Sequence, residues 1–215
     1  MVFRIDLKIF IFLILFYFTR QIEIYSMIMI FAIIHEFGHI IAGILLGMKV
    51  KKISIMPAGV GVEFKLTKDD YNYKILKSNK LEIKRIIVAS AGPLTNIILV
   101  YIIKMLSLPE ETKQIIIYSN LTIAIFNLIP IYPLDGGRIL KSTLSLIINK
   151  KNSSIYMNKI SNIILFLLTF IFSLLIYYYQ NIALLIILIY LWYIVLKENR
   201  INKAKIRVYN IIENL

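Results

Sequence analysis

The stretch Phe31-Ala-Ile-Ile-His35-Glu36-Phe37-Gly38-His39-Ile40-Ile41-Ala42-Gly43 places two histidines and a glutamate inside an apolar segment. Residues four apart share one face of a helix, so His35 and His39 can present a nitrogen each to a single ion. Glu36, next to them, can take a proton from water at that ion. Ionisable groups at membrane depth are costly and are usually functional. The pattern therefore predicts a metal site, against the alternative of three polar side chains that only bond one another in a helix bundle.

The composition indicates that the chain containing this motif spans a membrane. The 215 residues are 59% hydrophobic and 17% charged, which nearly excludes a water-soluble enzyme, because a soluble fold could not bury so much apolar surface. Six apolar segments are expected to be spans, with boundaries near 7–19, 22–48, 83–104, 113–130, 160–178 and 181–196. Residues 138–149 are too short to span and are predicted to form an interfacial helix.

The expected fold is therefore an all-α polytopic membrane protein of about six transmembrane helices. A short β-hairpin-like loop is predicted after the second span, in Lys52–Leu66, which has strand-like pieces around a Pro/Gly turn. One membrane-embedded domain is expected over residues 1–215. Its catalytic core covers about 20–145, its C-terminal helices about 155–200, and a cytosolic tail 197–215.

The basic residues predict an orientation in a cell membrane. With both termini in the cytosol, all but three of the 25 Lys and Arg residues lie on the cytosolic side, the exceptions being Arg20, Lys104 and Lys113. The positive-inside rule gives this asymmetry for an even number of spans. The net charge of +13 is thus better explained by anionic lipid than by nucleic acid, which is not expected as a partner. The first segment could be a signal peptide, but no small-residue cleavage site follows it, so it is interpreted as a retained helix.

The third metal ligand must be an acid if the ion is zinc. Catalytic zinc sites have three protein ligands and one open position, and this chain has no cysteine and no third histidine. Asp135 is favoured, because an acid beside an apolar helix end needs a partner. Pro130 and Pro133 precede it and break the fourth span, which lets the chain fold back into the membrane. Glu63 is the alternative, yet it lies in an alternating run that is typical of a solvated strand face.

Three segments, in this order, resemble the site-2 protease family of intramembrane zinc metalloproteases: His35–His39, Ser90-Ala-Gly-Pro-Leu-Thr-Asn96, and Asn127–Arg138 with its Leu134-Asp135-Gly136 core. The resemblance covers most of residues 20–145. The compact architecture is similar to the stage IV sporulation protein FB type, whose substrate is a membrane-associated pro-sigma factor. Longer relatives of that type carry a cytosolic CBS domain. Only 19 residues follow Leu196, so no such domain is expected here.

The resemblance implies zinc held by His35, His39 and Asp135, with Glu36 activating water. It also implies a role for Asn127 near the substrate carbonyl, although an amide that only bonds the helix backbone explains this residue equally well. The expected function is cleavage of a membrane-associated or transmembrane protein near the cytosolic membrane face. Membrane inhibitor proteins are further partners that such an enzyme can have.

Two other functions remain as alternatives at this stage. A zinc transporter could also place His and Glu on a membrane helix, but it would need polar residues along a path across the bilayer, and the outer halves of these spans offer almost none. A non-catalytic membrane scaffold would have no use for Glu36. Within the protease interpretation, an edge of the predicted hairpin is expected to pair with extended substrate, whereas the alternative is a plain surface hairpin.

Overall fold

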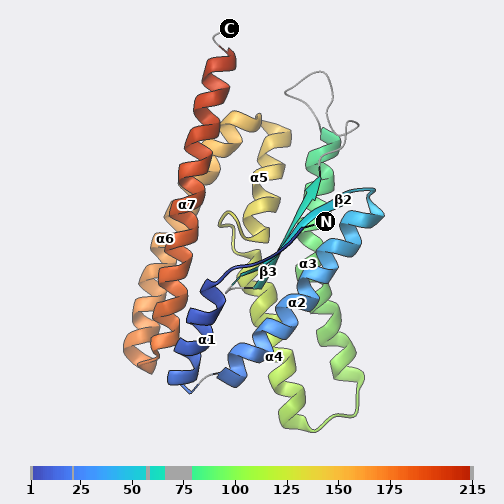
Figure 1. Ribbon diagram of the computed structural model, residues 1–215, viewed down its shortest axis with the longest axis vertical. Coiled ribbons are helices and arrows are strands. Elements are labelled where there is room, and N and C mark those ends of the chain that lie inside the picture. Colours follow the sequence, from blue (N-terminus) through green and yellow to red (C-terminus); the bar gives the residue numbers. More distant parts are fainter. Residues whose placement is uncertain (1, 21, 57–58, 66–78, 214–215) are drawn as a thin grey trace. The chain divides into compact units, whose positions relative to one another are not determined.

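The computed structural model describes residues 2–20, 22–56, 59–65 and 79–213 (Figure 1). Contacts between residues divide the chain into two compact units. Unit 1 comprises Met1–Asn72 and Ile87–Leu128, and unit 2 comprises Tyr73–Ile86 and Ile129–Leu215. Each unit is described by itself below.

Unit 1 joins a small sheet to apolar helices. Its elements are β1 (Val2–Ile5), α1 (Lys8–Phe18), α2 (Ile22–Leu45), β2 (Lys49–Met56), β3 (Gly59–Lys65), the part of α3 (Asn79–Met105) from Ile87 onward, and α4 (Glu110–Leu128). The predicted hairpin is confirmed, since β2 and β3 pair antiparallel. Its Pro57–Ala58 turn and Leu66 lie outside the described residues. The sequence did not predict β1, which pairs parallel with the other edge of β2.

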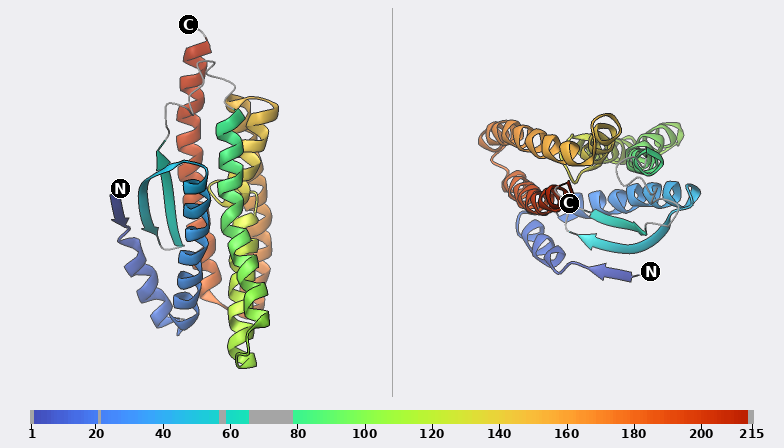
Figure 2. Two further views of the ribbon diagram at one scale, coloured as in Figure 1. Left: turned by 90° about the vertical axis from the view of Figure 1, so that its right-hand side faces the viewer. Right: turned by 90° about the horizontal axis from the view of Figure 1, so that it is seen from above.

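The sheet of unit 1 packs along α2, the helix that carries the histidines (Figure 2). Gly43 makes this contact close, because a Cβ atom there would meet the ring of Phe64 on β3. β2 is covered on both edges by β1 and β3. The edges of this sheet therefore belong to β1 and β3, and β3 is the hairpin edge that remains for the predicted pairing with a substrate.

Unit 2 is a bundle of α5 (Asp135–Ile147), α6 (Lys150–Tyr179) and α7 (Ile182–Glu213), together with residues 129–134 and the first turns of α3. A left-handed Gln180 ends α6, and the Asn181 side chain accepts from the Ala183 N–H to begin α7. Met157, Leu165 and Val195 are fully buried between the helices. The helix predicted at 138–149 is present as α5, whereas the predicted tail continues α7 as helix as far as Glu213.

Lys141 links α5 to α7 at the polar end of unit 2. Its ammonium donates to the Asn202 side chain at 3.0 Å and lies 4.3 Å from the centre of the Tyr132 ring. Burial, with a further contribution from Lys205, lowers the pKa of Lys141 to about 8. Asn202 in turn donates to Asn158 on α6, so one polar chain connects α5, α7 and α6.

Four helices in the described part of the chain are long and apolar enough to cross a membrane: Tyr25–Leu45, Lys80–Met105, Lys150–Tyr179 and Ile182–Ile211. They correspond to the second, third, fifth and sixth predicted spans. α1 has 11 residues, about 16 Å of helix at 1.5 Å per residue, which is short for the ~30 Å hydrocarbon core. α4 carries Glu110, Glu111 and Lys113 in its first turn. A membrane-spanning helical fold is thus confirmed, and the count of six spans stays a prediction.

Candidate metal centre

Two imidazoles project from one face of α2 and meet at their Nε2 atoms. His35 and His39 are buried, with 3% and 2% of their surfaces exposed. Their Nε2 atoms lie 3.1 Å apart. The Nδ1 atom of His35 bonds the Asn96 side-chain oxygen on α3 at 2.5 Å, and the Nδ1 atom of His39 bonds the Val88 carbonyl at 2.6 Å. Both rings are therefore held from behind by α3.

The partners of the two Nδ1 atoms determine where the ring protons lie. The Ile116 carbonyl can only accept, so it receives the Asn120 amide N–H at 2.9 Å. Asn120 then offers its oxygen to the Asn96 N–H at 2.8 Å, which leaves the Asn96 oxygen toward His35. That oxygen and the Val88 carbonyl are acceptors, so both Nδ1 atoms must carry a proton. In the neutral rings the Nε2 lone pairs consequently face each other.

Two imidazole nitrogens at this separation can both bind one cation. Zn–N bonds of about 2.0–2.1 Å at a tetrahedral angle put two ligand nitrogens about 3.3 Å apart. The 3.1 Å between the Nε2 atoms is close to that separation. Donation of the other ring N–H to a backbone carbonyl or an oxygen acceptor is also the usual arrangement behind a metal-bound histidine. The pair thus fits a divalent metal ion.

Small residues on both helices allow the histidines to lie this close to α3. A Cβ atom at Gly92 would meet the Nε2 atoms of His35 and His39. A Cβ atom at Gly38 would meet the Thr95 side chain, and would come within 2.9 Å of the Ala91 carbonyl. Gly38 and Gly92 therefore have the same function on the two helices. Each lacks a side chain at a point where the opposite helix places its own groups. Gly92 of the Ser90–Asn96 segment thus has a packing function.

Asp135 is held at the first turn of α5 by a tightly folded connection in unit 2. α4 ends at Leu128, before Pro130, as the prolines predict. The connection then folds back: the Ile131 N–H donates to the Ile129 carbonyl, and the Leu134 N–H donates to the Ile131 carbonyl. Gly137 admits this fold, because a Cβ atom there would meet the backbone of Ile131.

Asp135 itself is buried, with 4% of its surface exposed. Arg138, one turn further along α5, places a guanidinium nitrogen 3.6 Å from its carboxylate. A carboxylate at the N-terminus of a helix is also stabilised by the helix dipole. Both contacts favour the carboxylate form, which is the form that binds a metal.

The two histidines and Asp135 form a group able to bind one metal ion, since one ligand atom from each lies within 4.8 Å of the others. Two imidazole nitrogens and one carboxylate oxygen are a ligand set of catalytic zinc sites, in which a fourth position stays open. Glu36, half-buried on α2, directly follows His35.

Two other predicted residues have different surroundings. Glu63, the alternative third ligand, is exposed on β3 and forms ion pairs with Lys51 and Lys52 at 3.7 and 3.8 Å. It does not belong to the metal-binding group, in keeping with the solvated strand face expected for it. Asn127 donates from its amide to the Ile123 carbonyl of its own helix at 3.0 Å, the backbone-bonding alternative named above. Its role toward a substrate stays a prediction.

Sequence reasoning assigned no function to Asn96, Asn120 or the Val88 carbonyl. Both asparagines have no exposed surface and lie in apolar helices. A buried amide in such a helix was an available signal, because it requires a partner at membrane depth. The Val88 carbonyl had no sequence signal, since any residue would supply it.

The family model of peptidase family M50 matches residues 24–111 and 106–172, which together make up more than half of the chain. Stage IV sporulation protein FB of Bacillus subtilis is 29% identical over 126 residues, covering 57% of this chain and 40% of that protein. A zinc metalloprotease of Methanocaldococcus jannaschii is 29% identical over 198 residues, covering 87% of this chain and 52% of that protein.

The fold is also that of a solved structure. The site-2 protease from Methanocaldococcus jannaschii superposes with a TM-score of 0.65 at 20% identity, over 91% of this chain and 89% of that one. A helical membrane protein with an H-E-x-x-H pair on one helix and an acid on another is the class that this fold and this site define. The chain belongs to peptidase family M50, the site-2 protease family. It spans about half or less of the length of the two curated relatives.

Proposed function

We propose that this chain is an intramembrane zinc metalloendopeptidase. The observation that carries the proposal is the group of His35, His39 and Asp135, with one ligand atom from each within 4.8 Å of the others and both Nδ1 atoms bonded to oxygen acceptors. His35, His39 and Asp135 would hold the zinc ion. A scaffold would have no use for this ligand set with Glu36 beside it.

Zinc, when bound, polarises a carbonyl and lowers the pKa of its water toward ~7. The chain's own residues supply the remaining chemistry. Glu36 takes the proton from the attacking water and returns it to the leaving amine. Asn127 would donate its amide to the substrate carbonyl as negative charge develops there. Gly92 has no side chain, so nothing at this position displaces the two imidazoles from their orientation.

The proposed substrate is a membrane-associated or transmembrane protein cut near the cytosolic face of the bilayer, with both termini of this chain in the cytosol. The similarity to stage IV sporulation protein FB supports a substrate of the pro-sigma-factor type in sporulation. Membrane-bound inhibitor proteins are proposed as further partners. An extended substrate would pair with the edge of β3, because peptides commonly add a strand to a sheet edge and β2 already has two neighbours.

The test is proteolysis by the purified chain in vesicles, with a single-span or membrane-associated candidate substrate. Glu36→Gln removes the proton acceptor and keeps the three ligands. It should retain zinc and lower the cleavage rate by a factor on the order of 10²–10⁴. Equal cleavage by wild type and Glu36→Gln would contradict the proposal. Zinc flux into the vesicles without cleavage would favour a transporter instead.

A further inference from the structure

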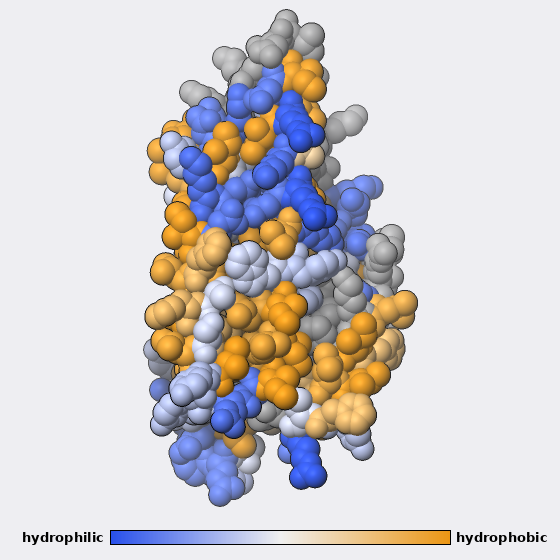
Figure 3. Space-filling model, turned by 90° about the vertical axis from the view of Figure 1, so that its left-hand side faces the viewer, coloured by the Kyte–Doolittle hydropathy of each residue, from blue (hydrophilic) through white to orange (hydrophobic). Residues whose placement is uncertain are grey.

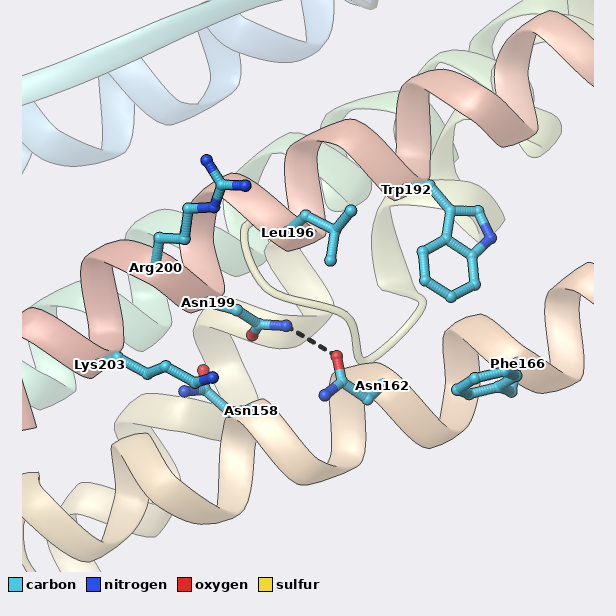
Figure 4. Close-up of a pocket in the computed structure, with 8 residues that line it drawn as sticks. All are labelled: Asn158, Asn162, Phe166, Trp192, Leu196, Asn199, Arg200 and Lys203. Carbon is cyan, nitrogen blue, oxygen red and sulfur yellow. Dashed lines mark hydrogen bonds between the residues drawn. The ribbon is translucent and has the colours of Figure 1, made fainter.

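Unit 2 contains a cavity of about 330 Å³ between α6 and α7 (Figure 4). Its lining includes two cations, Arg200 and Lys203, and three apolar side chains, Phe166, Trp192 and Leu196. Asparagine amides complete the lining, and none of the lining residues is acidic. None belongs to the candidate metal group, so the proposed protease chemistry does not explain this cavity.

The polar and apolar parts of the cavity are arranged along the helix axis. Trp192 and Lys203 are 11 residues apart on α7, about 16 Å at 1.5 Å per residue. Figure 4 shows Trp192 and Phe166 together at one end, with Lys203 and Asn158 together at the other. The lining is therefore complementary to a ligand that is anionic at one end and apolar at the other.

The cavity is built from side chains that are fixed by their own contacts. The Asn199 amide donates to Asn162 at 2.8 Å and ties α7 to α6 across the polar part. The indole N–H of Trp192 donates to Thr169 at 3.0 Å, and the Phe166 ring lies edge-on to the indole with centroids 5.5 Å apart. Because 66% of the surface of Phe166 is exposed, the apolar end is open to a ligand from the lipid side.

The cavity lies where both helices change from apolar to basic. α7 is apolar as far as Leu196 and then carries Lys197, Arg200, Lys203, Lys205 and Arg207. Figure 3 shows the same change of polarity on the surface over α6 and α7. Tryptophan is enriched at membrane–water interfaces, and basic pockets between membrane helices bind anionic head groups. A phospholipid places its phosphate at such a boundary between apolar and basic sequence.

We propose that the cavity is a binding site for one anionic phospholipid. The phosphodiester would lie at the polar end beside Lys203, and Arg200, whose guanidinium extends away from α6 in Figure 4, would turn toward it. The glycerol esters would lie against the asparagine amides, and an acyl chain along Leu196, Phe166 and Trp192. A soluble phosphate would leave the apolar end uncovered. A zwitterionic lipid would bring its ammonium group toward two cations.

The test uses Trp192, which is the single tryptophan of the chain. The full chain is reconstituted in phosphatidylcholine vesicles that contain a small fixed fraction of either phosphatidylglycerol or phosphatidylcholine with brominated acyl chains. Bromine quenches indole fluorescence only at short range. Brominated phosphatidylglycerol should quench Trp192 with an apparent preference on the order of tenfold over brominated phosphatidylcholine.

The variants then assign the preference to this cavity. In the double variant Arg200→Gln/Lys203→Gln, both brominated lipids should quench Trp192 nearly equally. Lys205→Gln/Arg207→Gln removes the same charge from exposed positions of the same helix and should keep the preference. The charge-conserving swap Arg200→Lys/Lys203→Arg should also keep it, which excludes misfolding as the cause of the loss.

Three results would overturn the proposal. The first is equal quenching of the wild type by both brominated lipids. The second is a full preference in Arg200→Gln/Lys203→Gln. The third is a change of Trp192 fluorescence on addition of inorganic phosphate without any lipid preference, which would indicate a soluble phosphate ligand.

Discussion

The proton on each Nδ1 atom is the residue-scale feature on which the metal site depends. Asn96 has no direct contact with an ion in this account, yet it determines which nitrogen of His35 is available. Without the Asn96 oxygen, the proton of the His35 ring could lie on Nε2 instead of Nδ1. The Nε2 atom would then have no lone pair with which to bind the ion. Its function is thus positioning, exerted through His35.

Asn96→Leu should therefore lower zinc affinity about 10–100-fold while leaving the fold intact. Competition with a zinc chelator of known affinity measures this change. Asn199→Leu is the control, because it removes an amide pair between α7 and α6 that is exposed and includes neither histidine. Unchanged affinity in Asn96→Leu would show that the His35 tautomer needs no such acceptor.

Motifs in the sequence predict His35, His39 and Asp135 as metal ligands, and these three residues form the group able to bind a metal ion. The role of Glu36 as proton acceptor stays a prediction. The acceptors behind the rings were not predicted. Asn96 and His35 are 61 residues apart in the sequence, so their hydrogen bond could not be predicted from local sequence. The Val88 carbonyl could not be predicted either, because every residue has a backbone carbonyl.

At the scale of elements, the close approach of α2 to α3 determines whether the imidazoles have room. Gly92→Ala adds a single methyl group at the Nε2 atoms of both histidines. The rings would have to rotate away from Asn96 and from the Val88 carbonyl to avoid it. A helix propensity gain from alanine, about 1 kcal/mol, acts in the opposite direction on stability.

Gly92→Ala should accordingly lose zinc while its helix content is preserved or raised. Circular dichroism combined with metal analysis of the purified variant measures both quantities. Ser90→Ala, a change of similar size in the same segment of α3, should retain zinc. A Gly92→Ala variant with full zinc content would mean that the helices can separate without affecting the site.

The helices and strands were predictable where the sequence has one clear hydrophobic periodicity or a proline that ends a helix. The hairpin followed from alternation around a Pro/Gly turn, and the end of α4 followed from Pro130. The lengths of α6 and α7 did not follow from hydropathy, because their polar ends, such as Lys150–Lys159 and Lys197–Glu213, are helical without being apolar. β1 was missed because four residues have no period of their own and gain a strand only by pairing with β2.

At the scale of the whole molecule, the positive-inside asymmetry predicts that both termini lie in the cytosol. The chain has no cysteine, so single cysteines report on one site each. Ser107→Cys, between α3 and α4, should be labelled in intact cells by a membrane-impermeant maleimide. Asn210→Cys, exposed near the end of α7, should be labelled only after permeabilisation. The reverse pattern would invert the orientation and move the proposed cleavage to the outer face.

The most direct test of the central claim is the zinc content of the purified chain, measured by mass spectrometry of the metal. The account predicts stoichiometric zinc in the wild type, Glu36→Gln and Glu63→Gln, and its loss in His39→Ala and Asp135→Ala. Wild-type protein without stoichiometric metal would contradict the account. So would an Asp135→Ala variant that keeps its zinc, particularly if Glu63→Gln loses it.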